Sequence, residues 1–143
     1  MNPGKICLHI QKLLYFLPEY KSPNDVPYEN GLYFFYEKGE ASRHSPKGRV
    51  VRIGNHPRSQ NRLIRRLKDH YKGNKNCSVF RKYIGGALIR KSKSDDICLA
   101  HWEMQDVPTC LKCKPAEENV DKYIKNHLSF RCIHIDDKNL RNR

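Results

Sequence analysis

Long apolar runs are missing from this 143-residue chain, and none approaches the roughly 18 residues that a membrane-spanning helix requires. The most apolar stretch near the N-terminus, residues 6–17, is interrupted by His9, Gln11 and Lys12, and no small-residue cleavage site follows it. We therefore expect a helix there and not a signal peptide. These absences predict a cytoplasmic protein with no membrane partner.

A secretory signal, which usually accompanies disulfide-bonded proteins, is also missing. The six cysteines accompany no secretory signal, which favours reduced and mostly buried thiols. With 38% hydrophobic and 30% charged residues, the chain has the composition of a globular protein, and its length suits one compact domain. We expect a helix and a proline-rich connector over residues 1–26, followed by the main domain over residues 27–143.

Acidic residues are nearly missing from the middle of the chain. Positions 41 to 94 contain 16 lysines and arginines but a single acid, Asp69, whereas the remaining positions contain 12 basic and 14 acidic residues. The net charge of +13 thus arises from one continuous stretch. Basic residues confined in this way favour a nucleic-acid partner, because each one placed on a phosphate releases condensed counterions. A solvated basic surface is the simpler alternative.

Apolar spacing and turn residues predict an α+β fold. Apolar runs bounded by turn residues predict three strands, over residues 31–36, 49–54 and 129–135. Apolar residues at helical spacing predict three helices besides the N-terminal one, over residues 59–71, over residues 78–90 and from residue 115 onward. The first two strands would form a hairpin, so we expect a small antiparallel sheet, the hairpin plus the later strand, flanked by helices. Gly85 and Gly86 either weaken their helix or mark a close helix approach.

Several polar side chains can converge on one basic patch. Tyr33 lies on the first strand of the hairpin. Arg52 and His56 have the same parity on the second strand, so both can point to one face of the sheet. On the following helix, side chains every four residues predict a polar stripe opposite the apolar face of Leu63 and Leu67. The members of this stripe are Arg62, Arg66 and His70.

The order of these motifs resembles that of the GIY-YIG nuclease family. Gly31-Leu32-Tyr33 opens the first strand, Arg52-Ile53-Gly54 closes the second, and Arg66 and His70 follow four residues apart. The similar stretches are residues 30–37, 52–56 and 78–81, and the resemblance covers roughly residues 27–137. It implies a GIY-YIG-like fold and an endonuclease that hydrolyses phosphodiester bonds, most simply of double-stranded DNA, with a divalent metal ion, Mg²⁺ or Mn²⁺.

The resemblance also implies roles for individual residues. Tyr33 would help to deprotonate the attacking water, and Arg66 would stabilise the pentavalent transition state, with His70 at the family's Arg-x-x-x-His position. Arg52 and His56 complete the candidate catalytic set. Neighbouring basic side chains are candidates for DNA binding, namely Arg58, Arg62, Arg65, Lys68 and Lys72.

Two departures from the family pattern concern the second motif and the metal. Arg52 stands where the family usually has a second tyrosine. The family's metal-binding glutamate lies on a helix beyond the Arg/His helix, where Glu117 and Glu118 are available, although the helix dipole alone also explains acids at a helix N-terminus. Otherwise the glutamate would follow Asp136-Asp137, close to the end of the sequence, which would indicate a fragment, a split gene or a degenerate enzyme. The metal ligands stay unassigned.

A second metal pattern and three function classes remain open. Cys98, His101, Cys110 and Cys113 have the pair spacing of a small structural zinc site, with free thiols in a loop as the alternative. The three classes are a metal-dependent GIY-YIG endonuclease, a non-catalytic nucleic-acid-binding protein (a degenerate or truncated nuclease), and an interaction module built on the zinc loop. The sequence does not define the oligomeric state.

Overall fold

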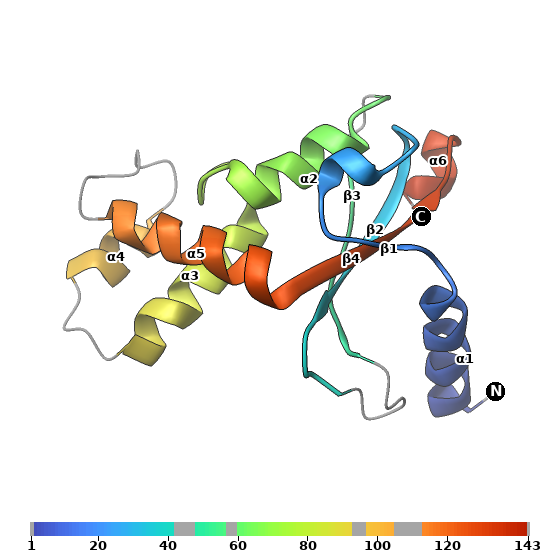
Figure 1. Ribbon diagram of the computed structural model, residues 1–143, viewed down its shortest axis with the longest axis horizontal. Coiled ribbons are helices and arrows are strands. Elements are labelled where there is room, and N and C mark those ends of the chain that lie inside the picture. The colour runs from blue at the N-terminus through green and yellow to red at the C-terminus, as the bar shows by residue number, and fades with distance from the viewer. Residues whose placement is uncertain (1, 42–47, 57–59, 93–96, 105–112, 143) are drawn as a thin grey trace. The chain divides into compact units, whose positions relative to one another are not determined.

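A computed structural model describes residues 2–41, 48–56, 60–92, 97–104 and 113–142 of the chain. These residues form an α+β structure with an antiparallel sheet (Figure 1). In chain order its elements are α1 (Pro3–Tyr15), β1 (Glu19–Tyr20), the 3₁₀ helix η1 (Pro23–Asp25), β2 (Gly31–Glu37), β3 (Val50–Asn55), α2 (Leu63–Lys72), α3 (Val79–Ser92), α4 (Ile97–Glu103), α5 (Lys114–His127), β4 (Leu128–His134) and α6 (Lys138–Arg141). The predicted fold class is confirmed, whereas the sequence does not predict β1, α4 or α6.

The chain divides into two compact units. The first contains Met1–Arg66 and His127–Arg143, and the second contains Leu67–Asn126. The sheet, α1 and α6 belong to the first unit, α3 and α4 belong to the second, and α2 begins in one and ends in the other. None of the described helices is long and apolar enough to cross a membrane.

The first unit is built on a sheet with strand order β1-β4-β2-β3. β2 pairs with β3 on one side and with β4 on the other, and its aromatic side chains alternate between the two faces of the sheet. Tyr33 lies opposite Gly54 of β3 and Cys132 of β4, and these three positions therefore share one face. Phe35 and Phe130 continue this face and are fully buried, with ring centroids 5.5 Å apart. This buried face forms the core of the unit.

Arg131 organises the opposite face of the same sheet. Its guanidinium donates a hydrogen bond of 2.9 Å to the carbonyl oxygen of Tyr15 and lies 4.8 Å from the centroid of that ring. It also pairs with the carboxylate of Glu19 at 3.2 Å. The nearly buried arginine thus joins the end of α1 and the short strand β1 to β4, which leaves the Tyr33 face for the candidate site.

In the second unit, α3 approaches α4 closely at a glycine. A Cβ atom at Gly85 would overlap the indole ring of Trp102, which is fully buried. The indole Nε1 donates to the carbonyl oxygen of Lys82 at 2.8 Å, so the bulky ring has its polar partner. Of the two interpretations of the paired glycines, the close approach of another helix is confirmed.

Candidate active site

The tyrosine of the first motif lies across the glycine of the second. Tyr33 is 1% exposed and stands opposite Gly54. A Cβ atom at Gly54 would overlap both the ring and the hydroxyl group of Tyr33, so the phenol occupies the space over this residue. Glycine is therefore required for the ring to stay where it is. The structure joins the two motifs at one point on the buried face of the sheet.

Gly31 and His56 meet at the start of β2. The N–H group of Gly31 donates to Nε2 of His56 at 3.5 Å, and this imidazole is 2% exposed. Gly31 also lies so close to β4 that a Cβ atom would overlap the carbonyl group of Ile133. His56 is thus held beside the strand that carries Tyr33. Because His56 follows the last residue of β3, strand alternation does not decide which face it shares.

Arg52 shares the face of Tyr33. It stands opposite Phe35, two residues along β2 from Tyr33, and its side chain is half-buried. Among the described residues, its buried Nε atom has no hydrogen-bond partner. A buried donor without a partner is uncommon in folded proteins, because the loss of its hydration is not compensated. Arg52 therefore places an unsatisfied buried donor on the face of Tyr33.

Helix α2 places its polar residues on different sides. Leu63, Leu67 and His70 are fully buried, and their spacing puts them on one side of the helix. Nδ1 of His70 lies 2.7 Å from the hydroxyl oxygen of Ser78. The predicted polar stripe is therefore wrong for His70, which points to the apolar side because a buried hydroxyl group is its partner there. Arg66 is half-buried at the border of this side.

The exposed side of α2 carries basic residues predicted to bind DNA. Arg65, Lys68 and Lys72 are exposed and follow helical spacing, so they form one line along the helix. Arg62, directly before the helix, is exposed as well. Arg58 lies outside the described residues. We call Arg62, Arg65, Lys68 and Lys72 the basic stripe.

A family comparison identifies the domain. The model of a family described as GIY-YIG domain matches residues 12–142, a span that includes both motifs and the basic stripe. The chain belongs to the GIY-YIG family. This membership assigns it a nuclease-type domain. No curated protein and no solved structure matches the chain.

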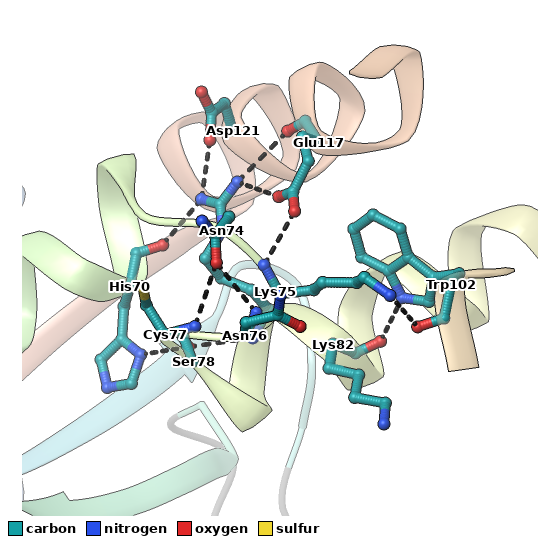
Figure 2. A network of polar contacts seen from close by, with 11 residues as sticks. His70, Asn74, Lys75, Asn76, Cys77, Ser78, Lys82, Trp102, Glu117 and Asp121 are labelled. Atoms are coloured by element: carbon teal, nitrogen blue, oxygen red, sulfur yellow. Dashed lines mark hydrogen bonds and ion pairs between the residues drawn. The ribbon is translucent and has the colours of Figure 1, made fainter. Parts of the chain in front are cut away.

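Glu117, one candidate for the GIY-YIG metal ligand, is an internal ion-pair partner in the second unit. Figure 2 shows its carboxylate directed at the backbone N–H group of Lys75, which donates to Oε1 at 2.7 Å. The other oxygen, Oε2, lies 2.7 Å from the guanidinium of the fully buried Arg81. Both carboxylate oxygens thus already bind donors of the protein. Glu118 is exposed.

The described part of this GIY-YIG chain contains no group of three or more His, Cys, Asp or Glu side chains placed to hold a metal ion. Mg²⁺ and Mn²⁺ can be held by one or two carboxylates together with substrate phosphates, so the described residues assign no metal ligand. The zinc prediction rests on four positions, of which Cys110 and the side chain of Cys98 lie outside the described residues. Cys113 is buried and His101 is half-buried. The zinc site stays a prediction.

Sequence reasoning missed one polar pair of the GIY-YIG domain, at the end of β4. Nε2 of His134 lies 3.0 Å from Oδ1 of Asp136. The hydrogen bond from His134 is the largest cause that holds the pKa of the Asp136 carboxyl below its ordinary value, which keeps this carboxyl ionised. The only signal in the sequence is a histidine two residues before an aspartate at a strand end, and that pattern is too common to single out.

Proposed function

We propose that this chain is a metal-dependent endonuclease of the GIY-YIG family that hydrolyses phosphodiester bonds in double-stranded DNA. The observation that carries the proposal is the position of the Tyr33 phenol over Gly54, which brings both family motifs to one point. The basic stripe supports a DNA partner, because it offers several phosphate contacts along one helix. A bound Mg²⁺ or Mn²⁺ ion would supply positive charge to the phosphate oxygens.

Different residues serve proton transfer and charge stabilisation in this proposal. Tyr33, in its phenolate form, accepts a proton from the attacking water. Arg52 and Arg66, both in the first unit with Tyr33, stabilise the negative charge that develops on the pentavalent phosphate. The position of Arg52 on the face of Tyr33 supports its role, and a guanidinium replaces the phenol usual at this position. His56 is a positioning residue, since its ring accepts the N–H group of Gly31.

Removing the hydroxyl group of Tyr33 is expected to slow DNA cleavage by about 10²- to 10⁴-fold, the usual contribution of a general base. Tyr33→Phe keeps the ring over Gly54, so the fold should be retained. Arg66→Ala is expected to slow cleavage as well, through lost charge stabilisation. The measurement is single-turnover nicking of supercoiled plasmid with Mg²⁺ or Mn²⁺, with Tyr83→Phe as the control, because Tyr83 is 71% exposed in α3. Activity that survives both substitutions would overturn these roles.

A non-catalytic nucleic-acid-binding protein is the second candidate. The observation that favours it is that two candidate site residues already have partners within the protein. His70 binds the hydroxyl group of Ser78, and Glu117 binds the guanidinium of Arg81 and the N–H group of Lys75. In that case the purified protein binds DNA but nicks it with neither metal ion. The plasmid experiment separates the two candidates directly.

Under both candidates, DNA binding is expected to weaken steeply with salt, with a logarithmic slope of about one for each phosphate contact. The double substitution Lys68→Gln/Lys72→Gln should therefore lower the slope by about two, because both side chains belong to the exposed basic stripe. Fluorescence anisotropy with a labelled duplex over a salt series measures this. Lys5→Gln/Lys12→Gln, on the exposed surface of α1, is the matched control. An unchanged slope in the stripe variant would exclude α2 from the DNA interface.

A further inference from the structure

The imidazole of His134 is held on two sides although its side chain is 51% exposed. Its Nε2 donates to the ionised carboxylate of Asp136 at 3.0 Å. The ring of Tyr28 stacks on it, with centroids 5.0 Å apart and an angle of 23° between the planes. Tyr28 is itself fixed, because its hydroxyl group donates to the carbonyl oxygen of Cys132 at 2.9 Å. The exposed ring thus has a defined orientation.

Asp136 is fixed in turn by a second layer of hydrogen bonds. Nδ2 of Asn30 donates to the same Oδ1 atom at 3.2 Å, and also to Oδ1 of Asn61 at 3.0 Å. The N–H group of Asn61 returns a bond of 2.9 Å to Oδ1 of Asn30. Segments before β2, before α2 and after β4 therefore converge on one exposed carboxylate. Support of this kind holds the carboxylate, and through it the imidazole, in one orientation, as functional side chains require.

The register of the sheet places His134 on the face of Tyr33. Cys132 stands opposite Tyr33, and His134 stands opposite Gly31, one step further along the same two strands. Because side chains alternate along β4, His134 lies on the same face as Cys132 and therefore as Tyr33. Gly31, which stands opposite His134, has no side chain that would separate His134 from Tyr33. With Nε2 bonded to Asp136, Nδ1 is the remaining ring nitrogen, and it has no hydrogen-bond partner within the described residues.

We propose that His134 is a further catalytic residue, the general acid that protonates the leaving oxygen of the cleaved phosphodiester, and that Asp136 is its positioning residue. The inference rests on the proposed nuclease function. The oxygen of water forms a bond to phosphorus while the bond from phosphorus to the leaving oxygen breaks. The phenolate form of Tyr33 takes the proton of the water and becomes the phenol, and the protonated imidazole gives its Nδ1 proton to the leaving oxygen and becomes neutral. Exchange with solvent then restores both side chains.

A sulfur atom in place of the bridging leaving oxygen tests this role, because a thiolate leaves without being protonated. We expect His134→Gln to slow single-turnover cleavage of the oxygen substrate by on the order of 10²-fold and to leave cleavage of the sulfur substrate nearly unchanged. Tyr33→Phe should slow both substrates, since both require activation of water. Asp136→Asn should show a smaller defect than His134→Gln, again confined to the oxygen substrate. His9→Gln, an exposed histidine of α1, is the control and should match the unsubstituted protein on both.

The outcomes separate this proposal from the proposed function. If the unsubstituted protein cuts both substrates and His134→Gln is slowed equally on both, or on neither, His134 is not the general acid, and the nuclease function stands. If the unsubstituted protein cuts neither substrate, the nuclease function fails and this role fails with it. Circular dichroism and thermal melting of each variant show whether a loss of cleavage reflects a loss of fold. A restored rate on the sulfur substrate cannot come from an unfolded variant.

Discussion

Gly54→Ala is expected to lower DNA cleavage by about 10²-fold or more, although the residue has no functional group. The added methyl group would overlap the ring and hydroxyl group of Tyr33, so the phenol must move. A displacement of about 1 Å in a catalytic group is enough for a loss of this size. The overpacking should also destabilise the fold by about 1–3 kcal/mol. Single-turnover nicking, with urea denaturation of the same preparation, measures both effects.

Gly86→Ala is the matched control for this substitution. A Cβ atom at Gly86 would meet its nearest neighbour, Nη1 of Arg90, at 3.6 Å, which is an ordinary contact. Alanine should therefore be tolerated at this helical position, and cleavage should not change. Combining Gly54→Ala with Tyr33→Phe should add little further loss of cleavage, because both changes act through one phenol. Full activity in Gly54→Ala would show that catalysis does not need the phenol where the structure places it.

Local patterns predicted the hairpin of β2 and β3 because the information lies within short segments. The aromatic run of β2 and the Val- and Ile-rich run of β3 define a hairpin by composition and spacing, and the structure pairs Tyr33 with Gly54 accordingly. The His134–Asp136 pair escaped prediction for the opposite reason. Its geometry depends on Asn30, which is more than one hundred residues away in the chain. The periodicity of apolar residues within a segment does not indicate a hydrogen bond between residues so far apart in the chain.

Which side of a helix is buried also depends on hydrogen-bond partners that cannot be identified from the sequence of the helix. His70 has the spacing of a polar stripe with Arg66, yet the hydroxyl group of Ser78 stabilises it in the interior. Charge counting has the same weakness. Lys75 and Arg81 belong to the basic stretch of the sequence, but both are buried and bind groups of the protein itself. The surface available to DNA is therefore less positive than the composition indicates.

Arg81→Met is expected to destabilise the fold by about 3–5 kcal/mol, the largest stability effect predicted for this chain. The guanidinium is fully buried and lies 2.7 Å from both Glu117 and Asp121, and it donates to the carbonyl oxygen of His70 at 3.0 Å. Methionine has a similar length but no charge, so two carboxylates would lose their common partner. Urea denaturation followed by circular dichroism measures the change in the free energy of unfolding.

The surface pair Arg90–Glu103 provides the matched control, because Arg90→Met removes the same group from a pair whose side chains are 60% and 49% exposed. Its cost should be about 0–1 kcal/mol, since water already solvates both charges. Adding Glu117→Gln to Arg81→Met should recover part of the loss, because one of the uncompensated carboxylates is then neutral. Equal effects of Arg81→Met and Arg90→Met would contradict a structural role for Arg81. A large effect confined to Arg81→Met would show that the ion pairs of Arg81 with Glu117 and Asp121 stabilise the second unit.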